Sequence, residues 1–303
     1  MSNFIVKKAR EMRDKLRSSG RTKITDRSKG KEKLCIILAG YKKDLWSEVF
    51  GRIKRFSDDD IDYCILSSGI YVKELEDIAE ENGWSYISTK RNNVALIQNI
   101  AINHFSNAKY IYKLDEDIFL CQGYFSDLYN AYIEGEMSSH YHVGIVAPLL
   151  PLNGFCYIHF LKKVGKLEEF EKKFGLAKHG SNVDDKVMVS PEIAKYLWNL
   201  SYEIDNLADR FSSNGLELIP CHCRFSIGAI LFKREFWQGM GRFKVGTGNA
   251  LGDDEVQMCS YAMTNSKSLI VSGNTLAGHY SFGPQNKVMN KAYQENNMLK
   301  RLF

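Results

Sequence analysis

The chain has 303 residues, 44% of them hydrophobic and 25% charged, so it can bury a sizeable core, and disorder is excluded for most of its length. Its formal net charge of +5 is uneven, because residues 1–33 hold 12 Lys and Arg against 4 Asp and Glu and leave 29 against 32 for the rest. Since this main part is not basic, no nucleic-acid partner is expected.

No stretch approaches the roughly 18 to 20 consecutive apolar residues of a membrane-spanning helix, and the N-terminus lacks the apolar run of a secretory signal. We therefore expect a cytoplasmic protein. The seven cysteines are scattered, and Cys35, Cys64 and Cys121 lie in apolar runs, where a reduced thiol packs like a small hydrophobic side chain. No disulfide framework is predicted.

Residues 1–32 are predicted to form a basic N-terminal arm, after which the folded part starts abruptly with the apolar run Leu34–Ala39. Further strands are predicted at Tyr63–Leu66, Trp84–Ser88 and Tyr110–Leu114, and helices at Val72–Glu81 and Val94–Phe105. This alternation predicts an α/β fold, Rossmann-like, with a mostly parallel central sheet and helices on both faces.

The pattern changes after a strand predicted at Val143–Ala147. Residues 152–220 are mostly helical in pattern, for example at Leu161–Phe174 and Pro191–Leu200. Strands are predicted again at Ser226–Phe232 and Ser268–Val271, and an amphipathic helix at Val288–Leu302. We expect one domain over residues 33–285, with halves at 33–150 and 151–285, a helical insertion in the second half, and a C-terminal helix in 286–303.

Three acidic residues, Asp115-Glu116-Asp117, follow directly on the strand-like run YIYKL. Carboxylates at i and i+2 can both turn toward one divalent cation, and ligands usually bind where parallel strands end. A D-x-D sequence occurs about once by chance in a chain of this length, and Asp58-Asp59-Asp60 is such a case. A solvated loop therefore remains the alternative to a metal site.

Four segments in this order resemble the GT-A glycosyltransferases, most closely glycosyltransferase family 2. The acidic triplet resembles the D-x-D motif of that family, and Arg91–Asn99 resembles the loop and helix that precede it. Phe225–Phe243 resembles the acceptor-side segment, and Gly252–Glu255 resembles the acidic element that opens the helix with the catalytic base. The resemblance covers about residues 33–285.

This resemblance implies a GT-A fold and a metal-dependent transfer of a sugar from a nucleotide diphosphate donor, a UDP-sugar before others, to a glycan, lipid-linked or protein acceptor. The first half would bind the nucleotide sugar and the second half the acceptor. The resemblance also implies Mn²⁺ or Mg²⁺, held by Asp115, Asp117 and His279, because many members place a late histidine ligand where Gly278-His279-Tyr280-Ser281 stands here.

Asp254 is our choice for the general base of an inverting transfer, because the start of a helix would fix its carboxylate and favour its anionic form. Asp253 and Glu255 compete for this role, and a helix cap without chemistry is the alternative. The other expected contacts are Tyr41, Arg91, Asn99 and Glu116 on the donor side, and Trp237 with Asp253 and Glu255 on the acceptor side.

One departure from the family concerns the second strand, which ends in Ser67-Ser68-Gly69 where members usually have an aspartate-glycine-serine group.

Two other classes of function stay open. One is a non-catalytic module of GT-A shape that binds a nucleotide sugar or a protein. The other is a sugar nucleotidyltransferase, which would want a glycine-rich loop where Ala39–Lys43 has a single glycine. A zinc site at Cys221-His222-Cys223 lacks the usual spacers.

The basic arm is predicted either as a solvated tail or as a peripheral contact with the anionic inner face of a membrane, where a lipid-linked acceptor would be found. Apolar side chains at both termini could add to such a contact: Phe4, Ile5, Val6, Met298, Leu299, Leu302 and Phe303.

Overall fold

The computed structural model describes residues 5–6, 8–9, 12–13, 22–138, 140, 142–180, 185–246 and 252–296. They fall into two compact units. Unit 1 draws on residues 1–46, 57–116 and 231–261, and unit 2 on residues 47–56, 117–230 and 262–303. Each unit combines strands and helices, and most strands of unit 1 run parallel, so the α/β fold class is confirmed.

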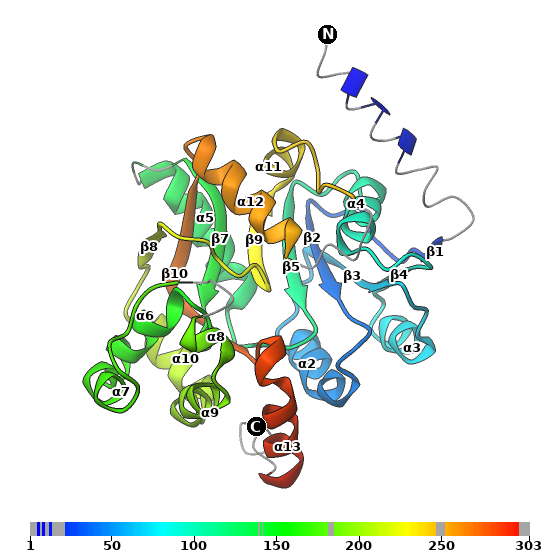
Figure 1. The fold of residues 1–303 in the computed structure, drawn as a ribbon. Helices are drawn as coiled ribbons and strands as arrows, with labels where there is room; N and C mark the ends of the chain where they lie inside the picture. The colour runs from blue at the N-terminus through cyan, green and yellow to red at the C-terminus, as the bar shows by residue number, and fades with distance from the viewer. Residues whose placement is uncertain are drawn as a thin grey trace. The chain divides into compact units, whose positions relative to one another are not determined.

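Unit 1 is built on five strands whose order is β1-β4-β3-β2-β5 (Figure 1). Strands β4, β3, β2 and β5 are parallel, and β1 pairs antiparallel with β4. Their bounds are β1 (Thr22–Thr25), β2 (Lys33–Leu38), β3 (Ile61–Ser68), β4 (Ser85–Thr89) and β5 (Tyr110–Asp115). Helices α3 (Lys73–Glu81) and α4 (Val94–His104) lie on opposite faces of these strands (Figure 1), which explains the nearly continuous apolar runs.

The strand order of unit 1 reverses at β2. Strand β2 pairs with β3 on one side and with β5 on the other, and Leu38 of β2 is opposite Asp115 of β5. The chain therefore runs outward from β2 to β4 and then crosses back, which makes the carboxyl ends of β2 and β5 a topological switch point. Tyr41 lies three residues past the end of β2, and Asp115 is the last residue of β5, so both lie where these strands end.

Residues 22–25 of the predicted basic arm form strand β1 of unit 1. Strand β1 pairs with β4 from Thr22↔Thr89 to Thr25↔Tyr86. The backbone N–H groups of Lys29 and Lys31 both donate to the Asp62 carboxylate at 2.8 Å. Strand β1 has four residues among charged neighbours and no apolar run, so the sequence pattern does not reveal it. Its partners lie far along the chain.

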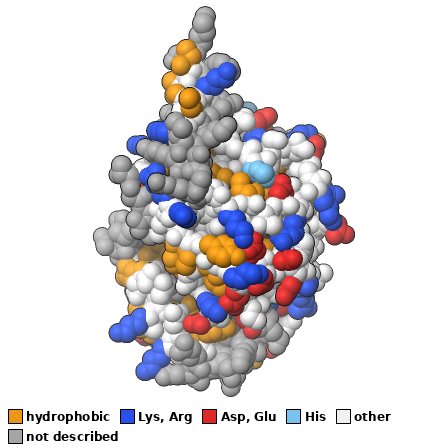
Figure 2. All heavy atoms as spheres, turned by 90° about the vertical axis from the view of Figure 1, so that its right-hand side faces the viewer, with side chains coloured by type: hydrophobic (Ala, Val, Ile, Leu, Met, Phe, Trp, Pro, Cys, Tyr) orange, Lys and Arg blue, Asp and Glu red, His pale blue; other side chains and the backbone are white. Residues whose placement is uncertain are grey.

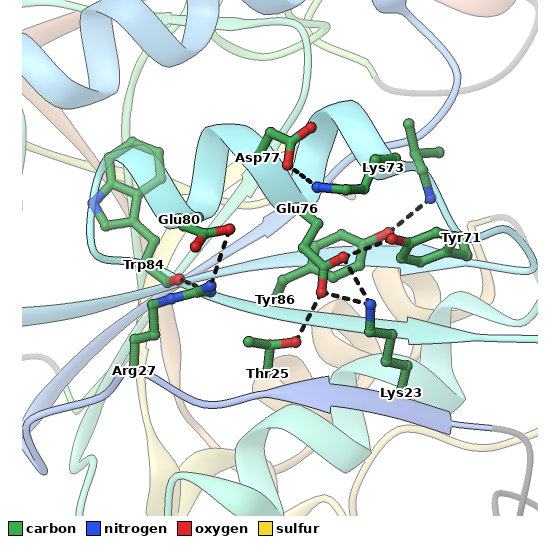
Figure 3. A network of polar contacts seen from close by, with 11 residues as sticks. Lys23, Thr25, Arg27, Tyr71, Lys73, Glu76, Asp77, Glu80, Trp84 and Tyr86 are labelled. Atoms are coloured by element: carbon green, nitrogen blue, oxygen red, sulfur yellow. Dashed lines mark hydrogen bonds and ion pairs between the residues drawn. The ribbon is translucent and has the colours of Figure 1, made fainter.

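A nearly buried carboxylate, Glu76 of α3, fastens β1 to the unit (Figure 3). It accepts hydrogen bonds from Lys23 Nζ at 2.7 Å, Thr25 Oγ1 at 2.9 Å and Tyr71 OH at 2.6 Å. These donors favour the anion, so the hydrogen bonds from Lys23 and Tyr71 lower the pKa of Glu76 to about 2.

We expect Glu76→Gln to lower the free energy of unfolding by about 2 kcal/mol at pH 7, because hydrogen bonds to a charged acceptor are lost. The folded pKa lies below the unfolded one, so this contribution is present above the unfolded pKa and is lost as pH falls toward about 2. Urea unfolding at several pH values measures it. Glu81→Gln, a substitution of an exposed residue, is the control. The assignment would be contradicted if the difference in free energy of unfolding between wild type and Glu76→Gln stayed constant down to the folded pKa.

The face of unit 1 that carries β1 and α3 intermixes basic and acidic side chains (Figure 2). Lys23 pairs with Glu76, and Arg27 lies 3.7 Å from Glu80. Part of the positive charge of residues 22–32 is therefore balanced within the unit. Of the predicted terminal apolar contacts, Ile5 and Val6 are exposed, whereas Phe4, Met298, Leu299, Leu302 and Phe303 lie outside the described residues.

Unit 2 is centred on β10, which pairs parallel with β7 and antiparallel with β8 and β6. The strands are β6 (Ile118–Leu120), β7 (Val143–Leu149), β8 (Leu218–Cys221) and β10 (Ser268–His279), and β9 (Ala229–Lys233) continues from unit 2 into unit 1. Strand β10 is longer than the strand predicted at Ser268–Val271, because it pairs with other strands up to its last residue, His279.

The remaining helices follow the chain as α2 (Lys43–Arg55), α5 (Tyr124–Ser138), α6 (Cys156–Lys163), α7 (Leu167–Phe174), α8 (Lys186–Val189), α9 (Pro191–Leu200), α10 (Ile204–Ser212), α11 (Arg234–Gly239), α12 (Asp253–Thr264), the 3-10 turn η1 (Gly283–Gln285) and α13 (Asn286–Asn296). The helix predicted at Leu161–Phe174 is divided between α6 and α7, because the chain turns at Gly165 with φ of 67°. Among the described residues, no helix has the length and apolarity that crossing a membrane requires.

Candidate functional site

Unit 2 brings Asp117 and His279 together, although they are far apart along the chain. His279 ends β10 opposite Ile118 of β6, the residue after Asp117. The backbone N–H of Tyr280 donates to the carbonyl of Asp117 at 3.0 Å. The imidazole Nε2 consequently lies 3.5 Å from Asp117 Oδ2, and both side chains are buried.

The other ring nitrogen of His279 fixes the tautomer. Nδ1 lies 2.8 Å from the carbonyl oxygen of Leu152, which can only accept, so Nδ1 carries the proton and donates it. In the neutral ring, Nε2 then presents its lone pair on the side of Asp117. Metal-ligating histidines in general use their second nitrogen in this way, so the pair fits a divalent cation.

Among the described residues, no three or more His, Cys, Asp or Glu side chains form a group that could hold a metal ion. Of the predicted ligands, Asp117 and His279 are the two that unit 2 brings together. Hard cations such as Mg²⁺ are commonly held by one or two carboxylates together with substrate phosphates and water. The zinc interpretation of Cys221, His222 and Cys223 gains no support.

In unit 1, Asp115 is paired with a buried lysine that the sequence analysis missed. Lys113 Nζ lies 2.7 Å from Asp115 Oδ1, with 3% of the lysine side chain and 39% of the aspartate side chain exposed. Burial opposes the charge of Lys113, but Asp115 and Asp254 outweigh it and raise its pKa. Lys113 is therefore an ammonium at neutral pH. The signal in the sequence was a lone lysine within the apolar run YIYKL.

The structure distinguishes the three acidic residues at the start of α12. Asp254 is 7% exposed and accepts a hydrogen bond from Gln98 Nε2 at 3.0 Å. Asp253 is exposed and Glu255 is half-buried. Helix α12 begins at Asp253, so Asp254 lies within its first turn, where the helix dipole favours an anion.

We expect Lys113→Met to destabilise the protein by about 3–5 kcal/mol, because it leaves the charges of Asp115 and Asp254 without their buried counterion. Lys33→Met is the matched control, since the Asp60 partner of Lys33 is 56% exposed and such pairs contribute about 0–1 kcal/mol. Urea unfolding at pH 7 gives both values. Equal losses in the two variants would show that Lys113 is not the buried counterion.

Glu116, predicted as a donor contact, holds the loop that follows β2. Its carboxylate accepts from the backbone N–H groups of Gly40 and Tyr41 at 2.9 Å and from Trp46 Nε1 at 2.5 Å. The Tyr41 hydroxyl donates to the carbonyl of Ser68 at 2.7 Å. Tyr41 nevertheless stays 63% exposed. Glu116 therefore positions Tyr41, whose ring is held in place and open to solvent.

Asn99 and Trp237, predicted as a donor contact and an acceptor contact, are buried and hydrogen-bonded to each other. Trp237 Nε1 donates to Asn99 Oδ1 at 3.0 Å, and Asn99 Nδ2 donates to the carbonyl of Phe243 at 2.8 Å. These bonds join α4 to α11, so both side chains serve the packing of unit 1. Arg91 is half-buried and donates to the carbonyl of Gly246.

No protein-family model matches the sequence, and no curated protein matches it. Among solved structures, the chain is similar to mannosyltransferase PcManGT from Pyrobaculum calidifontis in complex with GDP-Man and Mn²⁺, with 13% identity, a TM-score of 0.46, and 99% of this chain and 81% of that chain covered.

It is also similar to GalNAc-T7 with UDP, GalNAc and Mn²⁺, with 10% identity and a TM-score of 0.46. That match covers 85% of this chain and 45% of the other, so the chain spans less than half of that structure. A cytidylyltransferase from Leptospira borgpetersenii serovar Hardjo-bovis matches with 14% identity, a TM-score of 0.30, and 39% of this chain and 54% of that chain covered. Since these three TM-scores are below 0.5, the residues of the site carry the functional argument.

Proposed function

We propose that the chain is a metal-dependent GT-A glycosyltransferase that moves a sugar from a nucleotide diphosphate donor to an acceptor hydroxyl. The observation that carries the proposal is the acidic triplet, which begins at Asp115 on the topological switch point of unit 1 and continues into Asp117 beside His279. Mn²⁺ in the structures of a mannosyltransferase and of GalNAc-T7 agrees with it.

Asp117 and His279 would hold Mn²⁺ or Mg²⁺, with Asp115 as a further oxygen donor from the same triplet. The bound cation would supply charge neutralisation for the diphosphate as it leaves. Glu116 contributes indirectly, because its hydrogen bonds from three donors, the backbone N–H groups of Gly40 and Tyr41 and Trp46 Nε1, keep the loop of Tyr41 in place. The exposed ring of Tyr41 would stack on the nucleobase, and Arg91 would lie on the phosphate side.

Asp254 would act as the general base. The acceptor oxygen attacks the anomeric carbon, the bond to the diphosphate oxygen breaks, and the hydroxyl proton passes to the Asp254 carboxylate. Gln98 orients this carboxylate through its amide at 3.0 Å. A single displacement of this kind inverts the anomeric configuration.

Thermal shift with a panel of UDP-, GDP- and ADP-sugars tests donor binding, because a ligand of the folded state raises Tm by mass action. We expect a rise with one base class, larger with Mn²⁺ than with EDTA. Tyr41→Ala should weaken donor binding by about 10-fold, the scale of losing one base-stacking contact. Tyr202→Ala, an exposed tyrosine of unit 2, should change nothing. Equal donor affinity in Tyr41→Ala and Tyr202→Ala would rule out stacking on Tyr41.

A non-catalytic binding module and a sugar nucleotidyltransferase remain the alternatives. The first predicts donor binding without release of nucleoside diphosphate, and the second predicts release of pyrophosphate from a nucleoside triphosphate and a sugar phosphate. The buried carboxylate Asp254, which accepts a hydrogen bond from Gln98, favours a reaction that removes a proton. A cytoplasmic location, the acceptor and peripheral membrane contact stay predictions.

A further inference from the structure

Two cysteines of unit 2, Cys221 and Cys223, form a thiol pair that the proposed reaction does not use. Their Sγ atoms lie 3.9 Å apart, and both residues are partly exposed. The other five cysteines are buried: Cys35, Cys64, Cys121, Cys156 and Cys259. Reagents in solution therefore meet this pair before any other thiol of the protein.

The backbone explains why the two thiols meet. Cys221 is the last residue of β8, and Cys223 lies in the bend that follows two residues later, which brings the two sulfurs within 3.9 Å. His222 between them stands edge-on to the ring of Phe155, with centroids 6.1 Å apart. Pairing with β10 ends at Cys221, opposite Leu269, so Cys223 lies beyond the strand register. The Cys221 thiol also lies 3.3 Å from the carbonyl oxygen of Cys223 and can donate to it, a contact that a disulfide would replace.

The two thiols differ in acidity. The hydrogen bond between the two thiols lowers the pKa of Cys223, and the same contact, together with burial, raises the pKa of Cys221. Cys223 is therefore the better nucleophile of the pair, and Cys221 is the resolving thiol. Burial alone raises the pKa of Cys35, so that thiol is inert by comparison.

We propose that Cys221 and Cys223 form a reversible disulfide, a redox modification site whose oxidant is a small-molecule disulfide of the glutathione class. The Cys223 thiolate attacks one sulfur of the oxidant, forming a mixed disulfide and releasing one thiolate. Cys221 then loses its proton and attacks the Cys223 sulfur, which forms the Cys221–Cys223 bond and releases the second thiolate. Two protein thiols are oxidised and one oxidant disulfide is reduced to two thiols.

A disulfide across one intervening residue closes a very short loop, so it restricts the unfolded chain little and gains little stability from that source. Exposed disulfides of this kind are the labile ones. We therefore expect both oxidation by oxidised glutathione and full reversal by reduced glutathione in the native protein.

The test is to equilibrate the full chain in glutathione buffers of increasing oxidised fraction, alkylate free thiols after acid quench and denaturation, and map the peptides by mass spectrometry. We expect two of the seven thiols to escape alkylation, joined within the peptide that contains Cys221 and Cys223, and to return with reduced glutathione. Cys221→Ser should instead retain glutathione on Cys223, because the resolving thiol is gone. Cys259→Ser is the control and should behave like wild type.

Alkylation of all seven thiols at every ratio would overturn the proposal, as would a mixed disulfide that persists in the wild-type chain or a bridge between other cysteines. Zinc retained by the pair in place of oxidation would overturn it too. None of these readouts depends on sugar transfer, so the proposal can fail or stand independently of the proposed function.

Discussion

Asp254→Asn is expected to lower turnover by about 10² or more, the scale of losing a positioned general base, while donor binding stays near wild type. Asparagine keeps the size of the side chain and an oxygen that can accept from Gln98 Nε2. It removes the charge that would take the acceptor proton. The loss should therefore appear in kcat, with little change in the Kd of the donor.

The neighbouring carboxylates are the matched controls, because Asp253 is exposed and Glu255 only half-buried. Asp253→Asn and Glu255→Gln should keep most of the turnover. Steady-state kinetics with saturating donor, together with urea unfolding of each variant, separates chemistry from folding. A larger loss of kcat in either control than in Asp254→Asn would move the base to that residue.

Asp117→Ala is expected to abolish transfer and to remove the Mn²⁺ dependence of donor binding. The substitution leaves His279 as the one remaining ligand of the pair and deletes a carboxylate that a hard cation prefers. The carbonyl of residue 117 still accepts from the N–H of Tyr280, so the local pairing of the backbone is retained. Calorimetric titration of donor with and without Mn²⁺ measures the effect.

The control is the second acidic triplet, Asp58-Asp59-Asp60, which lies before β3 rather than after a strand. Asp59 is exposed, and Asp59→Ala should bind donor with the same Mn²⁺ dependence as wild type. If Asp117→Ala also kept that dependence, the metal would have to be placed elsewhere. Asp115→Ala should lose transfer as well, and it should lose stability in addition because it removes a partner of Lys113.

The fold of unit 1 was predictable from the sequence where strands are buried on both faces and are therefore apolar throughout. Strands β2 to β5 are covered by helices on both faces, so each reads as an apolar run, and their ends were predicted to within two residues. Strand β1 was not predicted, because its sequence TKIT has a single strongly apolar residue. The strand is held by hydrogen bonding to Glu76 and by its pairing with β4. Such partners lie far along the chain and leave no local pattern.

For the candidate residues, the sequence predicted the strand or helix on which each lies better than it predicted their contacts. The acidic triplet begins at the last residue of β5, and the three candidates at 253–255 do open a helix. Asn99 and Trp237, however, are each other's hydrogen-bond partners, and Glu116 turns inward to the loop of Tyr41. Polar side chains that satisfy one another in the interior have the same sequence signature as side chains that face a ligand.

The most direct test of the proposed function is release of nucleoside diphosphate from the donor that stabilises the protein in the thermal-shift panel, measured with Mn²⁺ and with EDTA for the wild type and for Asp117→Ala. We predict release by the wild type with Mn²⁺ alone, and none by the variant or in EDTA. Binding of that donor without any release across a panel of acceptors would contradict a glycosyltransferase and favour a binding module, and release that is equally fast in EDTA would contradict the metal.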